Sequence, residues 1–178
     1  MTPGVELGPM GVSPDEVVAV ARADAAVVLG PAARAEMEAS AAVVAARAAA
    51  EEPAYGISTG FGSLALVRIP PEARIALQHA LVRSHAAGMG PPIEREVVRA
   101  MMFLRARSLA MGRSGARPVV AERILALLAA GITPFVPEYG SLGASGDLAP
   151  LAHCALVLTG EGSVLSRDGS LASAAGWS

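Results

Sequence analysis

The stretch from Gly140 to Pro150 reads Gly-Ser-Leu-Gly-Ala-Ser-Gly-Asp-Leu-Ala-Pro. It has three glycines within seven residues and no helical period, which indicates a loop. The loop begins near Thr133, and so long a connection inside a compact chain usually carries a function. Asp147 is a favourable helix N-cap, so we expect an apolar helix over 148–159 to follow it.

The tripeptide Ala144-Ser145-Gly146 within this loop has the features needed for cyclisation of its own backbone. Gly146 offers an unhindered amide nitrogen that can attack the Ala144 carbonyl carbon, and Ser145 can lose its hydroxyl as water. Two dehydrations would give a five-membered ring with an exocyclic methylidene, an electrophile that the standard side chains do not supply. Glycine at position 146 also permits a tight backbone geometry that a Cβ would resist. On these residues alone, a glycine-rich turn before a capped helix remains the alternative.

Outward from this loop, the chain alternates helical patterns with proline and glycine signals. Ser13-Pro14-Asp15-Glu16 is typical of a helix start, because the serine can cap the helix and the glutamate can bond back to it. A hairpin signal surrounds Arg167-Asp168-Gly169. We expect helices over residues 14–21, 32–50, 70–87, 91–111 and 118–130, and a second glycine-rich loop over 54–67. The sequence therefore predicts one all-α domain over residues 1–178, with two long glycine-rich loops and a short C-terminal hairpin.

Composition argues against several classes of protein. The 178 residues carry a net charge of −2 and no basic stripe, so nucleic acid is not an expected partner. The longest strongly apolar stretch, Ile124–Ile132, is about half of a bilayer span, and we expect no membrane segment. Cys154 cannot form an internal disulfide and the N-terminus lacks a secretory pattern, which favours the cytoplasm. One cysteine with scattered histidines predicts no metal site, so we interpret His79, His153 and Cys154 as structural.

Three segments together resemble the signature of the aromatic amino-acid ammonia-lyase family. They are Gly140–His153, Tyr55–Gly62 (Tyr-Gly-Ile-Ser-Thr-Gly-Phe-Gly) and Ser84–Gly88 (Ser-His-Ala-Ala-Gly), in the family's order and spacing. The resemblance covers residues 12–166. It implies the N-terminal helical domain of the ammonia-lyase fold, in a family whose longer members add a central bundle of long helices and assemble as homotetramers. We therefore expect this chain to be a piece of a larger enzyme.

By this resemblance, Ala144-Ser145-Gly146 would become 4-methylideneimidazole-5-one (MIO), formed autocatalytically and without a dissociable cofactor. Tyr55 would be the base that takes the β-proton of an amino-acid substrate, and its glycine-rich loop would let it close over that substrate. His85 would contact the substrate side chain. Phe61 and Leu142 would line the pocket.

The resemblance also implies supporting roles, and the sequence departs from the family pattern in places. Gly143 and Asp147 would support the ring-forming loop. Ala80 and Arg107 occupy positions where histidine-specific members commonly have Asn, and Ser58 stands where Asn or Thr is usual. These departures lie outside the ring-forming triplet but weaken the assignment of histidine as the substrate.

Ser84-His85 followed by Ala-Ala-Gly resembles the histidine-specific branch more than the phenylalanine enzymes. The reaction expected of the complete enzyme is the non-oxidative loss of ammonia from L-histidine, which gives trans-urocanate. Tyrosine ammonia-lyases and tyrosine 2,3-aminomutases are the alternative, since they can also carry a histidine here, and a non-catalytic helical interaction module is a third. We expect the isolated chain to be inactive, because the family's substrate-carboxylate arginine lies in the absent bundle. We also expect its ring to be unformed.

Overall fold

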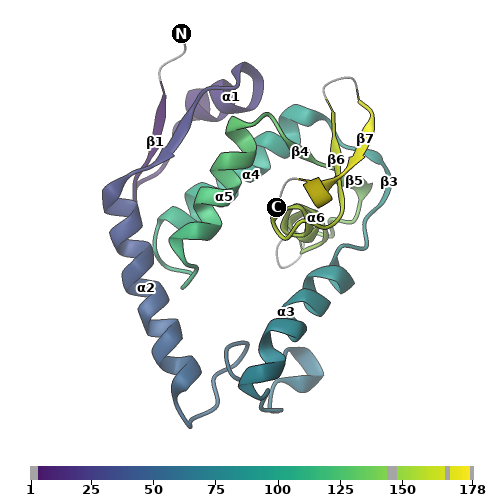
Figure 1. Cartoon of the computed structure of the whole chain (residues 1–178). Helices are drawn as coiled ribbons and strands as arrows, with labels where there is room; N and C mark the ends of the chain where they lie inside the picture. The colour runs from purple at the N-terminus through teal and green to yellow at the C-terminus, as the bar shows by residue number, and fades with distance from the viewer. Residues whose placement is uncertain (1–3, 144–147, 167–168, 177–178) are drawn as a thin grey trace.

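The computed structural model describes residues 4–143, 148–166 and 169–176, and its helices confirm the all-α prediction. The helices are α1 (Pro14–Ala23), α2 (Pro31–Ala49), α3 (Pro71–His85), α4 (Arg95–Ala110), α5 (Pro118–Ala129) and α6 (Leu148–Leu158). Figure 1 shows α1, α4 and α5 grouped on one side, with α6 and short strands on the other. Within the described ranges, no helix is both long and apolar enough to cross a bilayer.

The core lies around α4, which packs on both α1 and α5. Val98, Phe103 and Ala106 on its inner face have no exposed area. α1 begins with the expected capping box: Ser13 Oγ accepts a hydrogen bond from the Glu16 amide at 3.2 Å, and the Glu16 carboxylate accepts one from the Ser13 amide at 2.6 Å. These contacts fix the start of α1 and its packing on α4.

Arg99 is a fully buried cation at the centre of this helix packing. Its guanidinium donates to the Val20 carbonyl near the end of α1 at 3.1 Å and to the Leu128 carbonyl near the end of α5 at 3.1 Å. It also forms an ion pair with Asp24 at 2.9 Å. The carbonyls at a helix C-terminus carry partial negative charge, so one guanidinium fixes the ends of two helices against α4.

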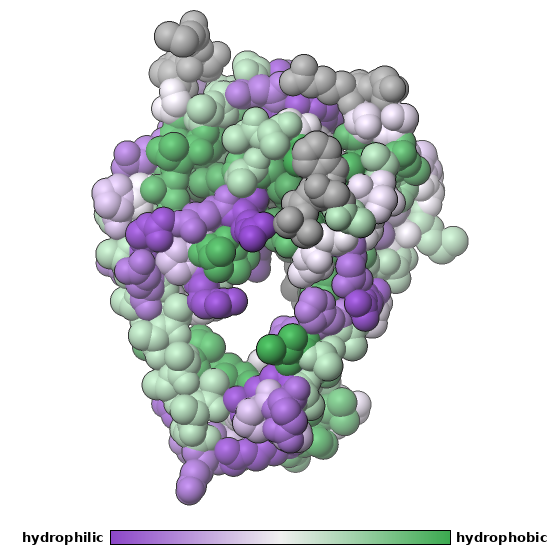
Figure 2. Space-filling view, in the orientation of Figure 1, coloured by the Kyte–Doolittle hydropathy of each residue, from purple (hydrophilic) through white to green (hydrophobic). Residues whose placement is uncertain are grey.

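Helices α2 and α3 form two arms that are joined by residues 50–70. Only Ala33 and Met37 are buried in α2, and no residue of α3 is buried. Arg83 of α3 is held by the Glu161 carboxylate, with hydrogen bonds of 2.7 and 2.8 Å. Figure 2 shows an opening through the molecule between its two sides. Both arms therefore leave much of their surface uncovered by the described chain.

Short strands also occur, which the sequence did not predict outside the hairpin. They are β1 (Val5–Leu7), β2 (Val27–Leu29), β3 (Met89–Pro92), β4 (Thr133–Pro134), β5 (Pro137–Tyr139), β6 (Ser163–Leu165) and β7 (Leu171–Ser173), with 3₁₀ turns at Gly62–Leu64 and Ala174–Gly176. β1 and β2 pair in parallel, β3 pairs antiparallel with β5, and β4, β6 and β7 form an antiparallel sheet in that order.

Two predictions were wrong near prolines. The helix expected from residue 91 begins at Arg95 instead, because Pro91-Pro92 belongs to β3. A proline disfavours helical angles in the residue before it, so adjacent prolines keep this segment extended. The loop expected over 133–147 contains β4 and β5, which each include a proline and find strand partners elsewhere in the chain.

The predicted C-terminal hairpin is confirmed. β6 and β7 pair antiparallel, with Ser163 opposite Ser173. Arg167 and Asp168 of the expected turn lie outside the described residues. Ala174, directly after β7, has no exposed area and belongs to the hydrophobic core, so the hairpin is anchored on the body.

Candidate active site

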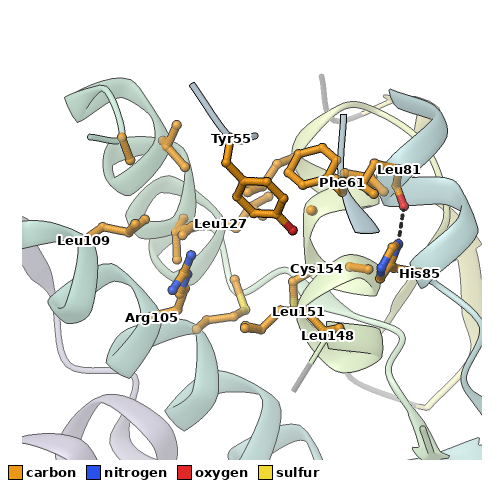
Figure 3. A pocket seen from close by; sticks show the side chains of 18 residues that line it. Tyr55, Phe61, Leu81, His85, Arg105, Leu109, Leu127, Leu148, Leu151 and Cys154 are labelled. Carbon is orange, nitrogen blue, oxygen red and sulfur yellow. Dashed lines mark hydrogen bonds between the residues drawn. The ribbon is translucent and has the colours of Figure 1, made fainter. Parts of the chain in front are cut away.

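A largely apolar cavity of about 640 Å³ opens between α3, α4, α5 and α6 and the loop after α2. Its lining includes Tyr55, Phe61 and His85, three of the residues singled out from the sequence. In Figure 3, Tyr55 and Phe61 lie on one side, Arg105 faces them from α4, and His85 stands on α3. Two separate segments of the sequence, 55–61 and 81–85, therefore contribute to one cavity.

The loop that carries Tyr55 is ordered from within by hydroxyl side chains. Ser58 is fully buried, and its Oγ accepts a hydrogen bond from the Ala54 amide at 2.9 Å. Its carbonyl accepts from the Ile69 amide at 2.9 Å, while the Thr59 hydroxyl accepts from the Gly56 amide at 3.3 Å. The departure from the family pattern at position 58 therefore falls on a residue that fixes the loop, because a buried hydroxyl with these partners cannot be exchanged without cost.

Tyr55 and Phe61 contact each other across this loop. Their ring centroids are 6.1 Å apart at an angle of 83°, the edge-to-face arrangement that aromatic pairs favour. Gly56 between them has a φ of +69°, and a Cβ there would lie 2.9 Å from the Phe61 ring. Tyr55 remains 63% exposed, and its hydroxyl points into the cavity in Figure 3. The arrangement leaves a phenol oxygen accessible to a ligand.

His85 ends α3 and is oriented by its own helix. Its Nδ1 lies 2.8 Å from the Leu81 carbonyl oxygen, which Figure 3 marks with a dashed line. A carbonyl oxygen only accepts hydrogen bonds, so Nδ1 is the protonated nitrogen and Nε2 is the acceptor in the neutral ring. The ring thus offers an acceptor nitrogen on a wall of the cavity.

The opposite walls add one cation and one thiol. Arg105 of α4 lines the cavity, and within the described chain no hydrogen bond or ion pair is found for its guanidinium. Cys154 of α6 lines it too, and burial raises the pKa of this thiol to about 12. A thiol with that pKa stays protonated at neutral pH, so Cys154 is an apolar wall residue rather than a nucleophile.

The predicted ring-forming residues and their cap, Ala144, Ser145, Gly146 and Asp147, lie outside the described residues. Their flanks are described. A Cβ at Gly140 would lie 3.2 Å from the Ala149 Cβ, so these two flanking residues are close neighbours. Gly143 has a φ of +64°, and Leu148, at the start of α6, lines the cavity. The tripeptide Ala144-Ser145-Gly146 is small and contains glycine, which fits the chemistry of a backbone-derived ring.

The other residues singled out from the sequence lie elsewhere. Leu142 is 92% exposed and is not among the residues that line the cavity. His79 Nδ1 lies 3.7 Å from the Glu161 carboxylate. His153 Nε2 accepts a hydrogen bond from the Gly88 amide at 3.1 Å, a structural contact. Within the described ranges, no three His, Cys, Asp or Glu residues gather as metal ligands.

Sequence reasoning missed Arg105 and most of the apolar lining. The lining includes Leu81, Ile124, Leu127 and Leu151. Periodicity placed these residues on helices, but it could not indicate that inner faces of four helices leave a space between them. The sequence offered one signal for a cavity residue: Arg105 is a cation on the same helix that buries Phe103.

Comparisons with known proteins agree on one family. The family model described as aromatic amino acid lyase matches residues 12–177. A histidine ammonia-lyase of Streptomyces coelicolor is 56% identical over 167 residues, 94% of this chain and 33% of that protein. A tyrosine ammonia-lyase of Cupriavidus metallidurans is 50% identical over 160 residues, 90% of this chain and 30% of that protein. The crystal structure of a tyrosine aminomutase from Streptomyces globisporus matches with a TM-score of 0.90 and 38% identity, over 97% of this chain and 32% of that one. This chain therefore spans about a third of the length of these relatives.

Proposed function

Because this chain belongs to the aromatic amino acid lyase family, we propose that it forms the N-terminal part of an enzyme that removes ammonia from L-histidine and gives trans-urocanate. The observation that carries the proposal is that Tyr55 and His85, from two separate family segments, line one cavity. The 56% identity to a histidine ammonia-lyase supports histidine as the substrate.

Tyr55 is the proposed base for the β-proton of the substrate. A general base must come within hydrogen-bond reach of that proton, and the exposed phenol oxygen at the cavity provides this reach. The edge-to-face contact with Phe61 and the hydrogen bonds around Ser58 hold the loop in place. Tyr55 is thus positioned by its loop and still accessible to a ligand.

His85 is the proposed contact for the substrate side chain. Since its Nδ1 is tied to the Leu81 carbonyl, its Nε2 can accept a hydrogen bond from an imidazole N–H. The apolar walls from α5 and α6, including Leu127 and Leu151, would pack on the faces of the substrate imidazole ring. Phe61 would contribute to the same surface.

We assign the electrophile of this reaction to Ala144-Ser145-Gly146, which would form MIO with Gly143 and Asp147 as its support. When formed, that group supplies an electron-deficient centre that makes the loss of the amine and of a weakly acidic β-proton feasible. The closeness of Gly140 and Ala149 supports this assignment, because it brings the two flanks of the segment together.

The assembly and location are also proposals. We expect a homotetramer by family resemblance, and the exposed arms α2 and α3 offer surface for such contacts. Light scattering of the complete protein would measure its mass in solution. A cytoplasmic location is supported by the lone Cys154, which has no partner cysteine in this sequence. Fractionation of the source cells would test it.

Tyrosine is the second candidate substrate. A phenol O–H can also donate to Nε2 of His85, so this contact does not separate the two substrates. A tyrosine ammonia-lyase at 50% identity and a tyrosine aminomutase with a TM-score of 0.90 support this candidate. Supplying each amino acid to the complete protein and identifying the products separates a histidine lyase, a tyrosine lyase and an aminomutase.

The deciding experiment follows urocanate by its ultraviolet absorbance. We expect the complete protein to convert L-histidine to trans-urocanate, and Ser145→Ala to abolish the conversion. We expect the isolated 178-residue chain to form none, because it spans only a third of its relatives and lacks the downstream part of the site. Conversion by the isolated chain, or by the complete Ser145→Ala protein at an undiminished rate, contradicts the proposal.

A further inference from the structure

A junction beside the cavity connects three elements that carry parts of the proposed site. The Gly88 amide donates a hydrogen bond to Nε2 of His153 at 3.1 Å, which joins the turn after α3 to α6. His85, the last residue of α3, precedes Gly88 by three residues. At the same place β3 pairs with β5, with Met89 opposite Tyr139. The contact between Gly88 and His153 therefore connects α3, the start of β3 and α6.

The junction is too tight for side chains at its glycines. A Cβ at Gly88 would lie 3.1 Å from His153 Nε2 and 3.2 Å from Pro137. A Cβ at Gly140 would lie 3.1 Å from the Cα of Gly88 and 3.2 Å from the Cβ of Ala149. Gly140 and Ala149 are the two flanks of the segment that contains Ala144-Ser145-Gly146. Gly140 thus lies directly against Gly88, which His153 holds, and Ala149 lies against Gly140.

The bond fixes the tautomer of the neutral His153 ring. A backbone N–H can only donate, so Nε2 must be the acceptor and the proton of the neutral ring must lie on Nδ1. α3 has no buried residue, and besides this bond the Arg83 guanidinium holds it to Glu161. Loss of this acceptor would leave the Gly88 amide without its partner in a confined site, which is costly.

We infer that His153 is a positioning residue: through the Gly88 amide it holds the end of α3, with His85, against Gly140, the residue that precedes the segment 141–148. It acts on the spacing between His85 and that segment and does not touch the substrate. Its effect on ring formation rests on the proposed function, whereas its hold on Gly88 does not.

The test compares two substitutions of similar size. His153→Gln keeps an acceptor close to the position of Nε2, and His153→Leu removes the acceptor. His79→Leu is the matched control, since His79 is a second histidine of this region that contacts Glu161, at 3.7 Å, and not Gly88. The first measurement is hydrogen exchange of the Gly88 amide in the 178-residue chain at pH 7.5. The second is the fraction of the complete protein whose 140–150 peptide is lighter by two waters.

We expect Gly88 exchange to accelerate about tenfold in His153→Leu. His153→Gln should restore most of the protection, and His79→Leu should leave it unchanged. The ring-bearing fraction should fall severalfold in His153→Leu and recover in His153→Gln, a rescue that simple loss of packing would not give. Unchanged Gly88 exchange in folded His153→Leu overturns the inference; if that variant does not fold, loss of protection in His153→Gln overturns it. A wild-type protein without the ring would contradict the proposed function and leave the exchange result to decide this inference.

Discussion

Tyr55 and Tyr139 are equally exposed, at 63% each, but they differ in what lies beside them. Tyr55 lines the cavity, whereas Tyr139 is not among its lining residues and packs on Gly90 of β3. Only Tyr55 lies at the cavity. Comparing substitutions at the two tyrosines therefore separates a loss of catalysis from the general effect of losing a hydroxyl.

Tyr55→Phe removes one oxygen and keeps the ring that contacts Phe61. In the complete protein we expect the rate of L-histidine deamination to fall about 10²- to 10⁴-fold, the usual contribution of a general base. Tyr139→Phe should leave the rate within a factor of about two, as expected away from the reacting atoms. Equal rates for wild type and Tyr55→Phe would remove Tyr55 from the proposed mechanism.

Arg99 is the residue on which the packing of α1, α4 and α5 depends most. Arg99→Ala would leave the Val20 and Leu128 carbonyls and the Asp24 carboxylate without the buried guanidinium. We expect the free energy of unfolding to drop by about 2–5 kcal/mol, because two backbone carbonyls lose their buried donor and a large buried side chain is removed.

Urea unfolding monitored by circular dichroism measures this loss. Arg22→Ala is the matched control, because Arg22 is an exposed arginine that pairs with Glu96 at 2.9 Å. Exposed pairs contribute little, so its unfolding midpoint should stay near that of the wild type. Similar midpoints for the two variants would contradict the role given to Arg99.

Among the elements, the connection between α4 and α5 is fixed by glycines that face α2. Gly115 has a φ of +68°, and a Cβ there would lie 2.2 Å from Val44 Cγ2. Gly62 has a similar φ of +56° but nothing within 4 Å of its Cβ position. The pair separates the cost of backbone strain from the cost of overpacking.

We expect Gly62→Ala to lower the free energy of unfolding by about 1 kcal/mol through strain alone. Gly115→Ala should lower it by about 1–3 kcal/mol more, because the added methyl group must displace α2. Denaturant titrations of the two variants supply the comparison. Losses of equal size would show that α2 yields without cost.

The link between α6 and the turn after α3 should respond to pH. Burial lowers the pKa of His153 below its ordinary value of 6.5, so the unfolded chain binds the proton first as the pH falls. The stabilisation is therefore complete above about pH 6.5 and is lost as the pH decreases through 6.5 toward the folded-state pKa.

Unfolding titrations between pH 8 and pH 5 test this for the wild type and His153→Gln. The stability difference between them should shift in favour of His153→Gln as the pH falls. A difference between wild type and His153→Gln that is constant across this range would contradict the burial of a neutral His153.

The helix starts could be predicted from the sequence, but the strands could not. Helix starts at Ser13 and Pro118 follow from caps and proline, which are local signals. The strands do not, because the pairings of β1 with β2 and of β3 with β5 join distant segments whose partners no local pattern names. The same holds for the cavity: motifs identified Tyr55 and His85, but packing among four helices brings Arg105 into it.

On the scale of the whole molecule, the described chain is unevenly covered. Val43 on α2, Leu66 on the loop and Ile75 on α3 are 62%, 95% and 72% exposed, and the opening in Figure 2 lies between these arms and the body. The relatives are about three times as long as this chain. The cavity, with Tyr55 and His85 on its walls, is therefore proposed as one part of a site that further polypeptide completes.

The most direct test of this proposal is the mass of the 140–150 peptide from complete protein that has been shown to deaminate L-histidine. We expect a peptide lighter by two waters in the active wild type. In Ser145→Ala we expect neither this mass loss nor the formation of urocanate. A peptide of full mass in a protein that forms trans-urocanate would contradict it.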